Sequence, residues 1–163
     1  MHNFYNFVPF RHLPPFIYVI YVSEALLKFD SMSSRTVRLL NRHGYYLEIR
    51  KTGEIAGSTA YENIYSDITI RTVDFGGKVT LQGKKSGLFL YMKANGDIST
   101  TALSSSECKE CVWKEEMSLV RPGFFHYSSA VYPRWFLGLT KKGAIKKGKR
   151  TKAGQRSTEW SRI

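Results

Sequence analysis

A concentrated run of cations near the C-terminus is the part of this sequence best equipped to bind a ligand. Residues 141–156 contain eight lysines and arginines, in a chain whose formal net charge is +12. Residues 134–163 hold ten basic side chains against the single acid Glu159, so nine of those charges lie there. A local excess of charge attracts nucleic acid, anionic lipid or sulfated polysaccharide. The segment therefore predicts a site for a polyanion.

The side chains of this segment suit sulfate or phosphate groups. Arg150 offers a planar guanidinium fork, the lysines add point charges and Gln155 adds a neutral amide. We expect Gly143, Gly148 and Gly154 to bend the backbone so that these groups converge, and to leave N–H groups open to anions. Affinity should then fall steeply with salt through counterion release. The alternative is a solvated basic loop with no dedicated ligand.

Residues that could support catalysis or hold a metal do not form a matching set. Cys108 and Cys111 have thiol-pair spacing, but a four-cysteine zinc site needs a second pair and a thioredoxin-like site needs a βαβ setting. We expect Cys111 to be a small core residue and Cys108 an incidental thiol. Glu115 and Glu116 are adjacent and would point to opposite faces of a strand. The sequence therefore predicts no enzyme, no cofactor and no metal site.

An internal repeat supplies the elements that would position the basic segment. Each of three segments contains an aromatic residue, a leucine, a turn glycine and a closing isoleucine, at offsets of 43 and then 47 residues. The matched positions are Tyr46, Phe89 and Phe136; Leu47, Leu90 and Leu137; Gly53, Gly96 and Gly143; and Ile55, Ile98 and Ile145. Apolar–polar alternation and the turn glycines are typical of β-hairpins.

The strands expected around these hairpins predict a closed all-β fold. Further alternating apolar pairs occur at Val37 and Leu39, at Ile68 and Ile70, and at Val79 and Leu81. Three units with roughly four short strands each predict a β-trefoil with pseudo-threefold symmetry over residues 34–163. A propeller needs at least four blades, which leaves a β-sandwich with accidental similarity as the alternative. The basic segment then follows the turn of the third hairpin, where the other two repeats carry no charge.

Residues 1–33 form an N-terminal extension outside the repeat. The apolar run at residues 16–22 is too short to cross a membrane, so we expect no integral membrane span. We interpret it as the apolar region of an export signal, with a structural or irrelevant extension as a close alternative. Pro14 and Pro15 directly before the run, and the lack of an Ala-x-Ala site after it, count against a signal.

The ordered motifs of residues 35–163 resemble those of the fibroblast growth factors. They are RHGYYLEI at 42–49, GLFLYM at 87–92 with NG at 95–96, ECVWKE at 110–115, WFLGL at 135–139 and GKRT at 148–151. The resemblance implies a β-trefoil and a secreted, extracellular signalling ligand. It implies heparan sulfate or heparin and the ectodomain of a receptor tyrosine kinase as partners, rather than nucleic acid.

The resemblance also assigns binding residues. The heparin-binding positions of the family fall on Arg42, Lys141, Lys146, Arg150, Gln155 and Arg156, and further charge surrounds them at Lys142, Lys147, Lys149 and Lys152. The receptor-binding positions fall on Leu40, Glu115, Phe124, Tyr127 and Ile163. Leu40 stands where the family has a tyrosine, and the segment at 117–127 is two residues longer than its family counterpart. The resemblance therefore implies a changed receptor face.

Two alternative functions use the same fold. The first is an intracellular relative, cytoplasmic or nuclear, that binds a membrane protein or nucleic acid; the altered receptor positions and the ambiguous N-terminus favour it. The second is a carbohydrate-binding trefoil of the lectin kind, which would carry a Gln-x-Trp tripeptide in each third. No such tripeptide occurs in this sequence.

Overall fold

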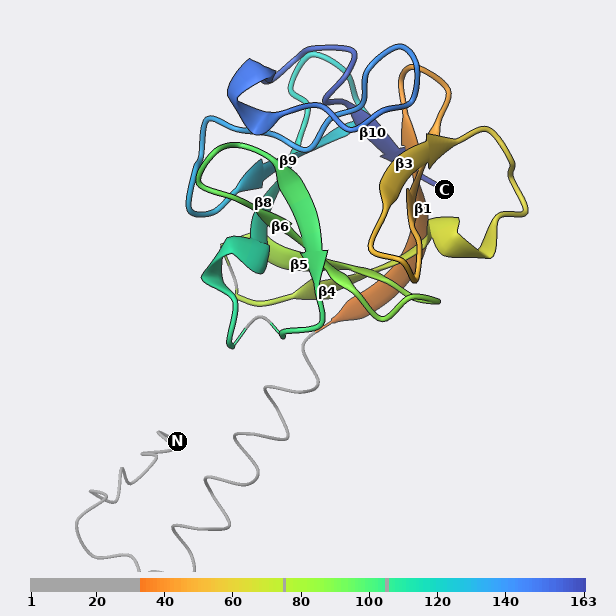
Figure 1. Cartoon of the computed structure of the whole chain (residues 1–163). Coiled ribbons are helices and arrows are strands. Elements are labelled where there is room, and N and C mark those ends of the chain that lie inside the picture. Colours follow the sequence, from red (N-terminus) through yellow and green to blue (C-terminus); the bar gives the residue numbers. More distant parts are fainter. Residues whose placement is uncertain (1–32, 75, 105) are drawn as a thin grey trace, which may run out of the picture. The chain divides into compact units, whose positions relative to one another are not determined.

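Six antiparallel strands close into a barrel in the computed structural model, which describes residues 33–74, 76–104 and 106–163. They are β1 (Ser34–Asn41), β4 (Asp67–Thr72), β5 (Lys78–Gly83), β8 (Val112–Met117), β9 (Phe125–Ser129) and β10 (Trp160–Arg162). Each strand pairs with the next in this order, and β10 pairs back onto β1. Figure 1 shows the resulting ring of strands. Closure leaves no unpaired edge between the barrel strands.

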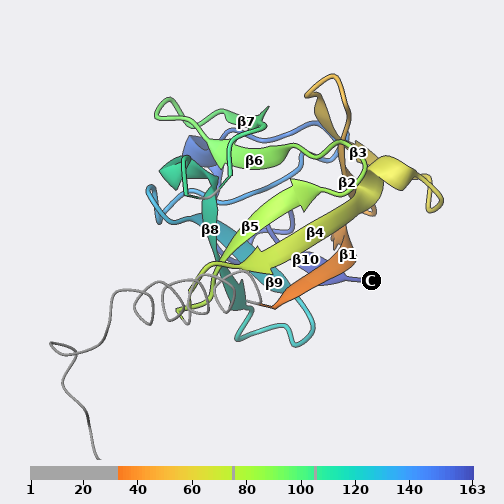
Figure 2. The same cartoon turned by 90° about the horizontal axis from the view of Figure 1, so that it is seen from below.

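Hairpins cap one end of this barrel. Strand β2 (Tyr46–Ile49) pairs with β3 (Ile55–Ser58), and β6 (Phe89–Met92) pairs with β7 (Ile98–Thr101). The two hairpins lie at the same end of the barrel (Figure 2). Gly53 and Gly96 turn them with φ of 86° and 87°, the left-handed backbone that favours glycine. A six-stranded barrel with hairpins at one end is a β-trefoil, so the predicted fold class is confirmed.

The third hairpin is less regular than the sequence repeat predicts. Its expected strands are joined by a single isolated bridge between Leu139 and Ile145. Two ladder bonds flank this bridge, from the N–H of Lys146 to the carbonyl of Gly138 at 2.9 Å and from the N–H of Thr140 to the carbonyl of Ala144 at 2.8 Å. The N–H of Leu139 donates to the carbonyl of Ser157, at 2.9 Å. The pairing of the third hairpin is therefore too short for either side to form a named strand. As a result the described residues contain ten named strands rather than four in every repeat.

The core contains the alternating apolar residues that the sequence indicated. Leu47, Leu90 and Leu137 are fully buried, one from each repeat. Trp113 and Trp160 donate their indole N–H groups to the carbonyls of Leu90 and Leu137, at 3.0 and 3.1 Å. The same contact thus recurs in two thirds of the molecule. The only helices among the described residues are three-residue 3-10 turns, at η2 (Ile64–Ser66), η3 (Lys109–Cys111) and η4 (Gly148–Arg150).

The two cysteines form a disulfide, which corrects the expectation that Cys108 is an incidental thiol. Turn η3 brings the Cα atoms of Cys108 and Cys111 to 5.3 Å, within the range that a disulfide spans. Both residues are buried, and they pack with Phe89 and Tyr91 in a second, smaller apolar cluster. The expectation that Cys111 is a buried core residue is confirmed.

The interpretation of the N-terminal extension, including the apolar run at 16–22, lies outside the described residues apart from Ser33. The boundary at residues 33 and 34 stays a prediction. Across the described ranges, no helix combines the length and apolar character needed to cross a bilayer.

Candidate functional site

The basic segment at 141–156 is fixed to the barrel and is not a free tail. The N–H of Gly148 donates to the carbonyl of Gly96, in the turn of the second hairpin, at 2.7 Å. The N–H of Phe136 donates to the buried hydroxyl of Thr151 at 2.8 Å. A Cβ atom at Gly148 would lie 2.9 Å from the Cβ of Trp135, which is fixed to the backbone, so this close approach favours glycine. The loop backbone is therefore held in place while most of its cations remain exposed.

The glycines of the segment do not act as the sequence suggested. Gly143 donates its N–H to the carbonyl of Thr140 at 3.0 Å, and Gly148 donates to Gly96. Both N–H groups are thus used inside the protein, and the expectation that they are open to anions is wrong. Gly143 and Gly154 have φ of 77° and 74°, so these two shape turns. The N–H groups of Gly143 and Gly148 are therefore not available to a ligand.

Four of the predicted heparin-binding residues converge on one hollow. Lys141, Lys146, Gln155 and Arg156 line a space of about 440 Å³ together with His43. The Lys146 ammonium donates to the Gln155 amide oxygen and to the Ser157 hydroxyl, at 3.2 Å each. We call this space the His43 hollow. It combines the C-terminal loop with the turn that follows β1.

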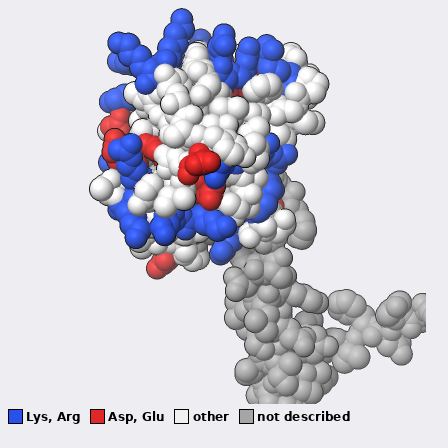
Figure 3. All heavy atoms as spheres, turned by 90° about the vertical axis from the view of Figure 1, so that its right-hand side faces the viewer, with Lys and Arg blue, Asp and Glu red and all other residues white. Residues whose placement is uncertain are grey.

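Positive charge dominates the His43 hollow. Burial lowers the pKa of His43, and the nearby charges of Arg156, Lys141, Lys146 and Arg42 lower that pKa further. None of the ion pairs among the described residues involves Lys141, Lys146 or Arg156. Figure 3 shows lysines and arginines gathered along the upper edge of the molecule, where Figure 1 places the C-terminal loops. An anion would bind here without competition from a local carboxylate.

The other predicted heparin-binding residues lie around the hollow in different settings. Lys142, Arg150 and Lys152 are exposed, with no ion pair among the described residues. Lys147 pairs with Asp97 at 3.1 Å, and the ammonium of Lys149 lies 5.4 Å from the centre of the Trp135 ring.

Arg42 differs from the exposed cations because its guanidinium pairs with the buried carboxylate of Glu159. It also lies over the ring of Phe124, 5.9 Å from its centre. Its backbone carbonyl, by contrast, accepts a hydrogen bond from the Arg156 side chain at 3.0 Å. The backbone of residue 42 therefore contacts Arg156, while the Arg42 side chain is occupied by Glu159. No pattern in the sequence indicated the partnership with Glu159.

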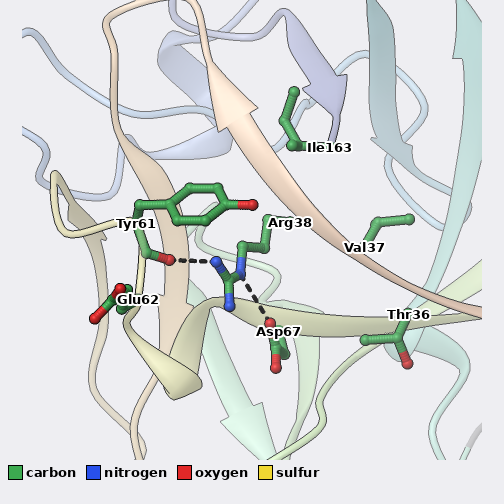
Figure 4. Close-up of a pocket in the computed structure, with 7 residues that line it drawn as sticks. All are labelled: Thr36, Val37, Arg38, Tyr61, Glu62, Asp67 and Ile163. Carbon is green, nitrogen blue, oxygen red and sulfur yellow. Dashed lines mark hydrogen bonds and ion pairs between the residues drawn. The ribbon is translucent and has the colours of Figure 1, made fainter.

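Two of the predicted receptor residues lie on one outer face of the barrel. Leu40 and Arg38 point to the same face of β1, and the backbone of Ile163 pairs with that of Arg38 at 2.9 and 3.0 Å. Arg38 donates to Asp67 at 2.9 Å and lies over the Tyr61 ring, 4.6 Å from its centre (Figure 4). All of these residues except Leu40 line a shallow hollow of about 390 Å³. Tyr61, which is 59% exposed, was missed by sequence reasoning because it lies in a loop without a pattern.

Two other predicted receptor residues are turned inward. The Glu115 carboxylate accepts hydrogen bonds from Arg35 at 2.7 Å and from Arg162 at 2.6 Å. Tyr127, opposite Glu115 in the β8–β9 register, is fully buried, and its hydroxyl has no hydrogen-bond partner among the described residues. Burial raises the pKa of the Tyr127 phenol. The expectation that Tyr127 contacts a receptor directly is therefore corrected, because none of its side chain reaches the surface.

Comparison with known proteins decides what kind of trefoil this is. The model of the family described as "Fibroblast growth factor" matches residues 35–161, almost the whole of the described domain. The chain belongs to the fibroblast growth factor family. The resemblance inferred from the ordered motifs is thereby confirmed. Fibroblast growth factors are signalling ligands, so the expectation that the chain is not an enzyme is confirmed as well.

Individual fibroblast growth factors are similar to this chain at modest identity. "Putative fibroblast growth factor 1" of Danio rerio is 32% identical over 115 residues, which cover 70% of this chain and 74% of the relative. "Fibroblast growth factor 8" is 24% identical over 144 residues in both Mus musculus and Gallus gallus, covering 86% of this chain. The matched region is 52% of the mouse protein and 65% of the chicken protein, so the chain spans about half to two thirds of their lengths.

Proposed function

We propose that this protein is a secreted growth-factor ligand that binds heparan sulfate through the His43 hollow and a receptor tyrosine kinase through a separate face. The convergence of Lys141, Lys146 and Arg156 without a paired carboxylate carries the glycan part of the proposal. Membership of the fibroblast growth factor family supports a signalling ligand. A sulfated glycan suits the hollow because its closely spaced anions can meet several cations and the Gln155 amide at once.

Retention on heparin tests the glycan part. Lys141→Ala with Lys146→Ala removes two cations from the His43 hollow, and we expect elution at clearly lower salt. The slope of log affinity against log salt should fall by about two, one for each cation removed. The matched control is Lys84→Ala with Lys85→Ala, which removes the same charge from an exposed turn before β6. If both double variants lose the same amount of retention, heparin binding depends on net charge alone and the His43 hollow is not a specific site.

We propose that the receptor contacts the face formed by Leu40, Ile163 and Tyr61. Phe124, whose ring lies beside Arg42 just after β1, is a further contact in this proposal. Ile163 and Tyr61 are 56% and 59% exposed and line the same hollow, so both side chains are accessible to a partner there. We expect Ile163→Glu to weaken binding to a receptor ectodomain while heparin retention stays unchanged. A variant that binds the ectodomain normally would remove this face from the proposal.

Glu115 has an indirect role in the proposed receptor contact, unlike the exposed residues. Its carboxylate is held by two guanidiniums, and its side chain is only 11% exposed. We propose that it acts by fixing Arg35 and Arg162, whose side chains are 35% and 29% exposed, rather than by direct contact.

The disulfide supports export over the intracellular alternative. Disulfides persist in oxidising compartments and are rare in the cytosol and nucleus. Expression of the full chain with a C-terminal tag should place protein in the medium, with Cys108 and Cys111 oxidised in a non-reducing peptide mass measurement. Protein confined to the cytosol or nucleus with both thiols reduced would favour the intracellular alternative.

A further inference from the structure

Charged side chains close the end of the barrel that lies away from the hairpins. Arg35, Glu115 and Arg162 lie on β1, β8 and β10, each an even number of positions from a fully buried residue of its own strand. Side chains alternate along a strand, so all three continue the inward-facing rows. Strand β1 begins at this end, and hairpin β2–β3 follows its other end. We call these three residues the Arg–Glu–Arg cluster.

The carboxylate of this cluster is already bound by two cations. Its Oε1 atom accepts hydrogen bonds from Arg35 Nη2 at 2.7 Å and from Arg162 Nη1 at 2.6 Å. Its Oε2 atom accepts a second hydrogen bond from Arg35, at 2.5 Å. The Glu115 side chain is largely buried, whereas both arginine side chains keep a larger exposed fraction. A partner that approaches this end of the barrel therefore meets guanidinium groups first.

The Arg–Glu–Arg cluster has an excess of positive charge that its neighbours do not cancel. Two guanidiniums and one carboxylate leave one positive charge. Lys114 and Lys78 lie opposite each other in the β5–β8 register, and each has an acid of its own, Glu116 at 2.6 Å and Asp74 at 2.9 Å. Neither cluster arginine has another acidic partner among the described residues. The site therefore attracts an anion.

The guanidinium of Arg162 is held in place with donors to spare. Its central carbon lies 3.5 Å from the centre of the Phe125 ring, and Nη1 is bound to Glu115. Its Nε and Nη2 groups donate to no atom among the described residues. A guanidinium presents its donors in a fixed plane that matches a carboxylate, and a side chain that is already ordered loses less entropy on binding.

We infer that the Arg–Glu–Arg cluster receives an acidic side chain, Asp or Glu, of the receptor ectodomain. This inference rests on the proposed receptor function and adds the charge of the partner surface that meets this end of the barrel. Arg162 directly precedes Ile163, so the cluster adjoins the proposed receptor face. A receptor cation placed here would be repelled by two guanidiniums before it reached Glu115.

Substitution of Arg162 tests the sign of the partner's charge. Arg162→Gln removes one cation and leaves Glu115 paired with Arg35. We expect the Kd for the ectodomain of a fibroblast growth factor receptor, measured by surface plasmon resonance, to rise about tenfold. Arg162→Lys keeps the charge without the planar fork, and its Kd should rise by about threefold. If Arg162→Gln tightens binding or leaves it unchanged, the receptor does not place an acid here.

A matched control and a stability measurement separate local charge from general effects. Arg134→Gln removes another exposed arginine that has no ion pair among the described residues, and we expect its Kd to equal that of the wild type. An equal rise in both glutamine variants would assign the effect to net charge and overturn the inference. Urea unfolding of each variant should show that Arg162→Gln remains folded under the binding conditions.

Carbodiimide cross-linking of the Arg162→Lys variant identifies the partner group directly. The carbodiimide activates a carboxylate, and an amine in contact with it displaces the urea and forms an amide. We expect mass spectrometry to find an amide between position 162 and an Asp or Glu of the bound ectodomain. An amide to Glu115 of the same chain alone, in a complex that still forms, would overturn the inference. If the wild type does not bind the ectodomain although it is retained on heparin, the receptor part of the proposed function itself fails.

Discussion

At the scale of single residues, the pKa of His43 reports on the charge of the His43 hollow. Burial and four neighbouring cations lower its pKa below the ordinary value of 6.5. Sulfate groups bound beside it would offset those cations and raise the pKa again. Ligand binding would then be linked to uptake of a proton by His43.

This linkage predicts a pH dependence of heparin binding. Affinity should rise as pH falls through the ordinary histidine pKa, between about pH 7.5 and 5. The free protein should lose some stability over the same interval, because a lowered folded-state pKa opposes protonation in the native state. His43→Gln should flatten the affinity profile in calorimetric titrations. An identical pH profile in wild type and variant would show that His43 does not contact the bound glycan.

Substitution of Arg42 should reduce the stability of the protein more than its retention on heparin. Glu159 is 1% exposed, and Arg42→Ala would leave it with the more distant Arg121, at 3.4 Å, and the Ser118 hydroxyl. Removing one partner of a buried ion pair costs about 3 kcal/mol. We expect urea unfolding to show a decrease of this order, with a smaller change in heparin retention than the Lys141→Ala and Lys146→Ala pair causes. Unchanged stability with strongly reduced retention would show that Arg42 binds the glycan directly.

At the scale of elements, the C-terminal loop depends on its packing against the second hairpin. Gly148 lies against Met92 and Trp135, and it donates its N–H to Gly96. The basic side chains are therefore displayed by a loop whose inner surface belongs to the core. Loop position and anion binding should consequently change together.

Gly148→Ala tests this coupling. Its Cβ would lie 2.7 Å from the Met92 sulfur and 2.9 Å from the Trp135 Cβ, and overpacking of this kind costs about 1–3 kcal/mol. We expect both a lower unfolding midpoint and weaker heparin retention. Gly154→Ala is the comparison, since nothing lies within 4 Å and only its φ of 74° opposes the substitution. If the Gly148→Ala variant is retained on heparin as strongly as the wild type, anion binding does not depend on the packing of the loop against the second hairpin.

At the scale of the whole molecule, the pseudo-threefold barrel distributes its core over all repeats. Trp113 and Trp160 occupy equivalent places and donate to equivalent leucine carbonyls. Strand β10 closes the barrel between β9 and β1, so the last repeat is as necessary to the core as the others. Damage to either tryptophan should therefore affect the entire domain.

Substitution of each tryptophan by alanine tests this equivalence. We expect Trp113→Ala and Trp160→Ala each to cost about 3–5 kcal/mol, since both side chains are fully buried. Unfolding followed by far-ultraviolet circular dichroism should remain a single transition in both variants. Two transitions in either variant would contradict a single cooperative core.

The sequence by itself determined the repeat, the hairpin turns and the buried faces of the strands. Gly53, Gly96 and Gly143 all adopt positive φ, and the alternating leucines and isoleucines are buried. These features depend on local backbone geometry and on a two-residue period, which are visible within a few neighbouring residues. The charge excess of residues 141–156 is equally local, so it too could be found from the sequence.

Only the tertiary structure decided which charged groups are free and which are occupied. Arg42 pairs with Glu159 across 117 residues, and Arg35 with Glu115 across 80. Burial of Tyr127, the bond between Cys108 and Cys111, and the His43 hollow beside the basic loop likewise follow from packing. Such partners are far apart in the chain or depend on the path of a turn. Their pairing is therefore set by the closure of the barrel and leaves no periodic pattern in the sequence.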